Sequence, residues 1–194
     1  MGARDKLVQL LEDVDRAGTS VVELVRGHRP LEPWTIYPDD AGVFDLTTRS
    51  QFYYHAHPGA THEAGHFHTV RLFEDHTAHL VGISIDPSGW PRALFTVNLW
   101  AIGDAYEPAE RLKRYVRQFQ IRADRADPRL VAFVNLAFRT FQPEIERLQD
   151  AKDRALTTYR RAHPGTDPVE DRTLEILSQV EVDLRSQQGG GRSG

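Results

Sequence analysis

Five of the nine histidines in this chain fall between positions 55 and 68. Four of them form two His-x-His pairs, His55 with His57 and His66 with His68. Because alternate residues of a β-strand point to the same side, each pair places two imidazoles on one face of a strand. Imidazole nitrogen is a ligand of zinc, iron and copper. The residue types and their spacing therefore predict a metal site.

The two pairs can face each other across a β-hairpin. If the residues between the pairs form the connecting loop, His57 lies opposite His66 and His55 lies opposite His68. Directly opposed Cβ atoms lie about 4.5 to 5.5 Å apart on neighbouring strands, so all four imidazoles can converge on one ion. The loop supplies His62 as a fifth candidate ligand.

The same loop carries one carboxylate, Glu63. A carboxylate beside a bound metal ion can act as a ligand, or as a general base that takes a proton from a metal-bound water. If the site performs chemistry, we expect three of the four histidines to be ligands and Glu63 to be the catalytic group. The fourth histidine is the alternative base or a supporting residue.

The chain contains no cysteine, which limits the metals and the ligands that the site can use. Without thiolate, a metal ion must be held by imidazole, carboxylate or water. The expected cofactor is a divalent transition metal, namely iron, zinc or copper, and the general order of metal affinities does not select among the three.

Three functions follow from such a site. The first is a metalloenzyme, a hydrolase or an oxidoreductase acting on a small-molecule substrate, which keeps one coordination position open. The second is a non-catalytic metal sensor, buffer or delivery protein, for which a closed site of four histidines is typical. The third is a domain whose histidines bind an anion or another protein without a metal.

The residues around the histidines resemble a known sequence family. Residues 52–57, then Glu63, then residues 65–68 are similar to a motif of an uncharacterised bacterial family of about this length, described as a domain of unknown function. The later stretch at 94–100 fits the same family. The resemblance covers most of the chain and implies no activity.

Two better-known families share fragments of the motif. Residues 55–58 are similar to the His-x-His-Pro of JAMM metalloproteases, but that family also needs a Ser-x-x-Asp downstream, which is missing after Pro58. Cupins combine a His-x-His and a glutamate with a later histidine in an all-β barrel. The extensive helical segments of this chain argue against a complete cupin barrel.

The segments that carry the histidines have the composition of β-strands. Aromatic and β-branched residues are concentrated in four ranges, 51–57, 66–73, 79–86 and 92–100,. A Pro-Ser-Gly turn after Asp86 suits a hairpin. The pattern predicts an antiparallel sheet of about four strands in a meander, with Phe52, Tyr54 and Phe67 alternating with the histidines and facing the core. Further residues that can line the site are Asn98, Trp100, His76 and His79.

Helices are expected on both sides of the sheet segment in the sequence. Apolar residues recur at helical spacing in 5–26, 107–122, 128–161 and 167–184,. Gly18 and Pro143 are expected to divide or bend their helices. Asp167 as N-cap and Pro168 at the first helical position predict the start of the last helix. The expected fold is α+β, in which N-terminal and C-terminal helices cover one face of the sheet at 51–100.

Length and composition limit the remaining possibilities. A chain of 194 residues predicts one metal-binding α+β domain at 1–186, followed by a disordered glycine-rich tail at 187–194,. The formal charge of −4 gives no support for nucleic-acid binding,. With no apolar run long enough to span a bilayer and no export signal, we expect no membrane partner and a cytoplasmic location. These patterns do not specify the oligomeric state.

Overall fold

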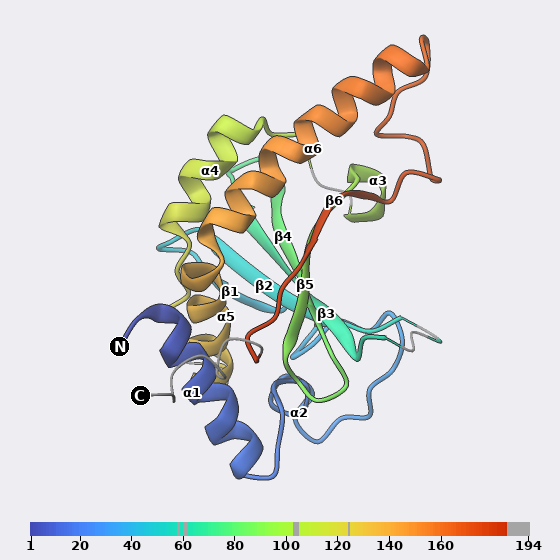
Figure 1. Ribbon diagram of the computed structural model, residues 1–194. Helices are drawn as coiled ribbons and strands as arrows, with labels where there is room; N and C mark the ends of the chain where they lie inside the picture. The colour runs from blue at the N-terminus through green and yellow to red at the C-terminus, as the bar shows by residue number, and fades with distance from the viewer. Residues whose placement is uncertain (58, 60–61, 103–104, 124, 186–194) are drawn as a thin grey trace, which may run out of the picture.

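The computed structural model describes residues 1–57, 59, 62–102, 105–123 and 125–185. Within these residues the chain forms six helices and one six-stranded antiparallel sheet with the order β1-β2-β3-β4-β5-β6 (Figure 1). The helices are α1 (Ala3–Arg16), α2 (Val21–Arg26), α3 (Leu99–Ile102), α4 (Ala109–Gln118), α5 (Pro128–Thr140) and α6 (Gln142–Ala162). The strands are β1 (Val43–Asp45), β2 (Ser50–His55), β3 (Gly65–Leu72), β4 (Thr77–Ile85), β5 (Pro91–Val97) and β6 (Ile176–Glu181). The predicted α+β class is confirmed, and the predicted tail lies outside the described residues.

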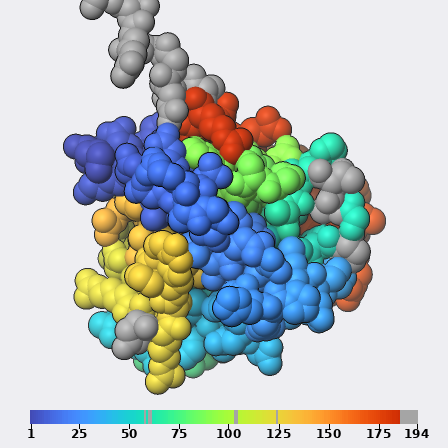
Figure 2. Space-filling model, turned by 90° about the horizontal axis from the view of Figure 1, so that it is seen from below, coloured from blue at the N-terminus to red at the C-terminus, as the bar shows by residue number. Residues whose placement is uncertain are grey.

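The main helices cover one face of the sheet, and the hydrophobic core lies between the two layers (Figure 1). Phe52 and Tyr54 of β2 and Phe67 of β3 are fully buried. The rings of Phe67 and Phe133 of α5 have centroids 5.4 Å apart. Figure 2 shows the N-terminal helices, in blue, lying beside α5, in gold. This packing confirms that Phe52, Tyr54 and Phe67 face the helices, so the residues that alternate with them face away.

The predicted four-stranded meander corresponds to strands β2 to β5. The hairpin turn between β4 and β5 forms as expected, with the N–H of Gly89 bonded to the carbonyl of Asp86 at 2.9 Å. The sheet has six strands rather than about four because each edge gains one. At one edge β1 pairs with β2, placing Val43 opposite Phe52. A strand of three residues is too short to show an alternating pattern in the sequence.

At the other edge β6 replaces the last predicted helix, and that prediction is wrong. Asp167 and Pro168 start a turn, in which the Asp167 carboxylate accepts the N–H of Val169 at 3.1 Å. The chain then pairs with the free edge of β5, setting Val180 opposite Leu94. Cap residues are also turn residues, so their presence did not distinguish a helix from a turn followed by an edge strand.

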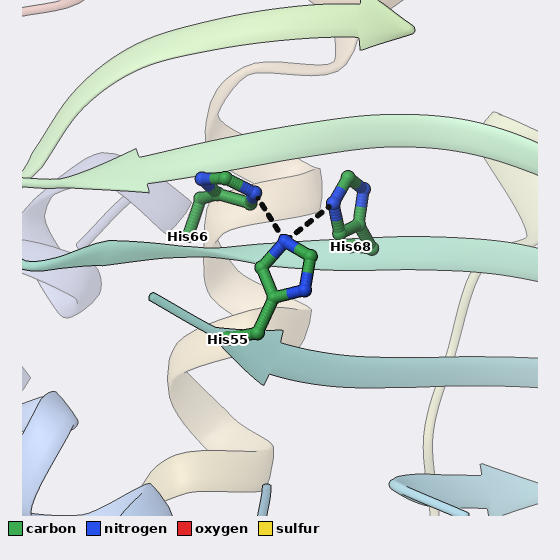
Figure 3. A group of neighbouring side chains, drawn as sticks. All are labelled: His55, His66 and His68. Carbon is green, nitrogen blue, oxygen red and sulfur yellow. Dashed lines mark hydrogen bonds between the residues drawn. The ribbon is translucent and has the colours of Figure 1, made fainter. Parts of the chain in front are cut away.

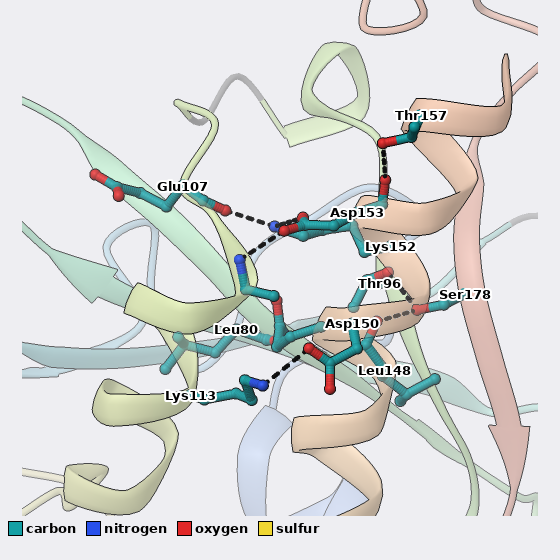
Figure 4. Close-up of polar contacts among 12 residues, drawn as sticks. Leu80, Thr96, Glu107, Lys113, Leu148, Asp150, Lys152, Asp153, Thr157 and Ser178 are labelled. Carbon is teal, nitrogen blue, oxygen red and sulfur yellow. Dashed lines mark hydrogen bonds and ion pairs between the residues drawn. The ribbon is translucent and has the colours of Figure 1, made fainter. Parts of the chain in front are cut away.

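Polar contacts link the edge strand β6 to β5 and to α6, and a further contact links α6 to the segment before α4 (Figure 4). Ser178 of β6 bonds to the Thr96 hydroxyl at 2.7 Å and donates to the carbonyl of Leu148 at 2.9 Å. The buried ammonium of Lys152 donates to the carbonyl of Glu107 at 2.7 Å. The sixth strand is therefore tied both to its neighbour and to the covering helix.

Helices α1, α2, α4, α5 and α6 correspond to predicted helical ranges, whereas α3 was not predicted and begins inside the expected strand at 92–100. Gly18 separates α1 from α2, and the segment at 128–161 is divided into α5 and α6 just before Pro143. Both divisions were predicted. No helix among the described residues has the length and apolar character needed to cross a membrane.

Candidate metal centre

Strands β2 and β3 position three histidines on the sheet face that points away from the main helices. His55 is the last residue of β2 and lies opposite His66, while Tyr53 lies opposite His68. The predicted register was therefore wrong by two residues. A shift of two residues keeps every side chain on its face, so the predicted shared face of these histidines is retained.

Gly65 explains where the second strand of the hairpin begins. Gly65 has a φ of 143°, which residues other than glycine rarely adopt,. A Cβ atom at this position would overlap the Tyr54 hydroxyl and the backbone oxygen of His55. The glycine thus lets β3 start directly against the end of β2, which sets His66 beside His55.

The three imidazoles point toward one another (Figure 3). The Nε2 atom of His55 lies 2.7 Å from that of His66 and 3.3 Å from that of His68. One ligand atom from each of these residues lies within 4.8 Å of the other two. His57 approaches from the segment after β2, and its Nε2 lies 3.3 Å from that of His55.

These separations match the spacing of ligands around one ion. Two nitrogen atoms bound at about 2.0 to 2.1 Å in tetrahedral geometry lie about 3.3 Å apart. The two contacts of His55 with His57 and His68 have this length. The shorter contact with His66 has to widen by several tenths of an ångström when an ion binds.

Hydrogen bonding alone does not account for the cluster. The Nε2 atom of His55 has three imidazole nitrogens as neighbours. A neutral imidazole nitrogen carries either one hydrogen or one lone pair, so His55 can satisfy at most one of them. Without a cation, the other nitrogens at this distance have no hydrogen bond with His55. A metal ion would accept the lone pairs of His55, His66 and His68, whereas His57 lies outside this group of mutually close ligand atoms.

Glu63 lies behind His66 rather than between the converging nitrogens. Its Oε1 lies 3.0 Å from the Nδ1 of His66, and its Oε2 accepts the Ser84 hydroxyl at 2.5 Å. An ionised carboxylate only accepts hydrogen bonds, so the Nδ1 of His66 carries the hydrogen, and in a neutral ring this leaves the lone pair on Nε2. Carboxylates hold metal-binding histidines in this way.

A second histidine supports His68 from the neighbouring strand. His79 of β4 is buried, and its Nε2 lies 3.1 Å from the Nδ1 of His68. When the Nδ1 of His68 donates to His79, its Nε2 is free to bind an ion. Sequence reasoning left His79 as one of several possible lining residues.

Burial favours the uncharged form of three of the histidines. It lowers the pKa of His55 to about 3, with repulsion from His66 and His57 adding to the effect. It also lowers the pKa of His57 and His68. For Glu63, burial alone would raise the pKa, but hydrogen bonds from His66 and Ser84 bring it to about 2. At neutral pH His55, His57 and His68 are therefore neutral imidazoles, and Glu63 is an anion beside them.

A cavity of about 490 Å³ opens beside the cluster. Trp34 stands at its edge, with its ring centroid 4.3 Å from that of His57. His62 also lines the cavity, but it is exposed and lies outside the group of converging ligand atoms. Sequence reasoning did not select Trp34, Ser84 or the aromatic wall residue Phe95, because their place depends on tertiary packing.

The remaining candidates have different surroundings. The Asn98 side chain is fully buried and donates to the carbonyls of Pro168 and Leu174, so it joins β5 to the segment before β6. Trp100 belongs to α3 rather than to a strand, and it lines the cavity. His76 bonds to Asp75 and Glu107, outside the cavity lining.

Comparison with known sequences places this chain in a family. It belongs to the family described as a domain of unknown function, DUF6969, which matches residues 1–182. The resemblance seen in the histidine motif is thereby confirmed. No curated protein and no solved structure matches the chain. The function must therefore be argued from the geometry of the site.

Proposed function

We propose that this member of the DUF6969 family binds one divalent transition metal ion through His55, His66 and His68, with His57 as a fourth ligand. The convergence of the imidazole nitrogens on one point, which hydrogen bonding cannot satisfy, is the observation that carries the proposal. Iron, zinc and copper all accept such ligands.

We further propose that the centre is catalytic, as a hydrolase or an oxidoreductase acting on a small molecule. The cavity beside the cluster supports this, because it gives a substrate direct access to the ion. His57 is only partly buried and comes from outside the strands. It is thus the ligand most easily displaced, and its departure opens one coordination position.

The second candidate is a non-catalytic metal sensor, buffer or delivery protein. The approach of His57 to His55 favours it, because four histidines close a tetrahedral site,. The two candidates differ in what His57 contributes. A catalytic centre keeps its metal when His57 is replaced, whereas a closed centre loses it.

The metal content of the full chain, purified without a histidine tag, tests the proposal. We expect about one equivalent of iron, zinc or copper by elemental analysis, and its loss in His55→Ala. The matched control is His163→Ala, because His163 is exposed and stacks on Tyr159 far along the chain. Wild-type protein that takes up no stoichiometric metal during dialysis against these ions would refute the proposal and favour an anion-binding or protein-binding role.

Replacement of His57 then separates the two candidates. For the catalytic centre, His57→Ala retains metal with an affinity much closer to wild type than that of His55→Ala. For the closed centre, the two variants lose metal alike. Competition with a chromophoric chelator measures both affinities on the same scale.

A further inference from the structure

The cavity beside the histidine cluster has two chemically different walls. One wall is formed by the ligand imidazoles. The adjoining wall carries apolar side chains, namely Phe95 and Val97 of β5, Ile102 of the following α3 and Ile176 of the sequence-distant β6. A molecule that reaches the ion therefore lies against hydrocarbon and aromatic surface.

Gly82 allows the apolar wall to come close to the ligands. It lies between His68 and Phe95 in the sheet, paired with both. The Phe95 ring occupies the space that a Cβ atom of Gly82 would fill. The ring centroid consequently lies 5.1 Å from that of His66 and 6.0 Å from that of His68. Apolar surface thus begins directly beside the proposed ion.

The charges around the cavity determine the sign of the charge that a ligand should carry. The histidine ligands are neutral, so a divalent ion keeps its full charge of +2. The cavity lining also contains the charged residues Arg92, Glu63 and Glu175. One arginine and two carboxylates bring the formal sum to about +1 with the ion present. The apolar wall lowers the local dielectric and strengthens the attraction for an anion.

We propose that the centre binds a small organic carboxylate, whose oxygen coordinates the metal and whose apolar body lies along Phe95, Val97 and Ile176. This inference depends on the proposed metal site. A single negative charge matches the formal charge of the cavity, whereas a phosphate dianion exceeds it and gains nothing from the apolar wall. A cavity of this volume is in the usual range for small-molecule sites,.

The test uses the full chain loaded with Co(II), whose visible absorption responds to exogenous ligands. Cobalt content is measured first, and then acetate, butanoate and hexanoate are titrated. We expect the affinity to rise about fourfold for each methylene that the apolar wall buries. Hexanol and hexylammonium, which lack the carboxylate, should bind at least tenfold more weakly than hexanoate.

Ile176→Asp probes the apolar wall in a strand at the edge of the sheet. Because Ile176 is 41% exposed, we expect the fold to tolerate the replacement. We expect it to reduce the preference for hexanoate over acetate at least tenfold. The matched control is Leu46→Asp, since Leu46 is 71% exposed and does not line the cavity.

Each result decides a different question. Protein that takes up no cobalt, zinc, iron or copper overturns both the metal site and the carboxylate proposal. Protein that takes up cobalt but binds the three carboxylates equally, or binds inorganic phosphate more tightly than hexanoate, retains the metal site and overturns the carboxylate proposal. A hexanoate preference that survives Ile176→Asp also overturns the proposed position of the apolar body.

Discussion

Replacing Glu63 tests whether this carboxylate holds a ligand or moves protons. Both of its oxygens are engaged, Oε1 with His66 and Oε2 with Ser84. If Glu63 orients His66, then Glu63→Ala removes the acceptor that fixes the hydrogen on Nδ1 and leaves the ring free to turn. Loss of such a supporting group typically weakens metal binding about 10- to 100-fold, or about 1.4 to 2.7 kcal/mol.

Two milder variants give an expected order of effects. In Glu63→Gln an amide oxygen still accepts from His66 but without charge, and charge-assisted hydrogen bonds are about twice as strong as neutral ones. In Ser84→Ala only the contact that steadies the carboxylate is lost, and His66 keeps its charged acceptor. Metal affinity should therefore fall most in Glu63→Ala, less in Glu63→Gln and least in Ser84→Ala.

Competition titrations with a chromophoric chelator at pH 7 measure these affinities. Glu74→Ala is the control, because the side chain of Glu74 is 86% exposed and pairs only with the surface residue Arg49 in the contacts described. If Glu63→Ala binds metal as tightly as the wild type, the carboxylate does not hold His66. Glu63 would then be available for the catalytic role that its loop position suggests.

Three further replacements test other parts of the structure. His79→Phe keeps the buried ring but removes the acceptor behind His68, so metal affinity should fall about 10- to 100-fold. The control His163→Phe should leave the chelator titration unchanged, and a His79→Phe affinity equal to that of the wild type would refute the supporting role. For Asp45, burial raises the pKa but hydrogen bonds from three backbone N–H groups hold it below its usual value, so its stabilisation is present above about pH 4 and is lost as the pH falls through the folded pKa. Asp45→Ala should thus lower the free energy of urea unfolding by about 2 kcal/mol at pH 7 and by less near about pH 3, and an equal loss at both would contradict the linkage. Gly82→Ala should displace the Phe95 ring and cost about 1 to 3 kcal/mol in the same assay, whereas full retention of stability would show that the ring moves freely.

The face of each histidine was predictable because it depends only on the alternation along a strand. His55, His66 and His68 share a face in any register that differs by an even number of residues. The same alternation placed Phe52 and Phe67 in the core, where both are fully buried. The register itself was not predictable, because it depends on where the loop ends, and Gly65 sets that point through its contact with the backbone of β2.

The prediction of the last helix was wrong for a related reason. Asp167 and Pro168 form a local turn equally well, and the choice was made by the free edge of β5. The spacing of residues along the sequence does not reveal that edge, because the strand that pairs with it lies about eighty residues away, as the pairing of Thr96 with Ser178 shows. Backbone pairing at an unoccupied edge outweighed the weak local preference for helix.

The position of His79 shows how one irregularity in the sheet completes the site. Between β3 and β4 the register changes at Thr69 and Val70, so that Thr69 pairs with Val81 and Val70 with His79. In an unbroken ladder Val70 would pair with Leu80, and His79 would point to the face that carries the core. The extra residue of the bulge places His79 on the face of His68, where the Nε2 of His79 lies 3.1 Å from the Nδ1 of His68,. The bulge thus brings His79 beside a proposed metal ligand, and it leaves Leu80, the residue that Val70 would otherwise pair with, buried among the apolar residues.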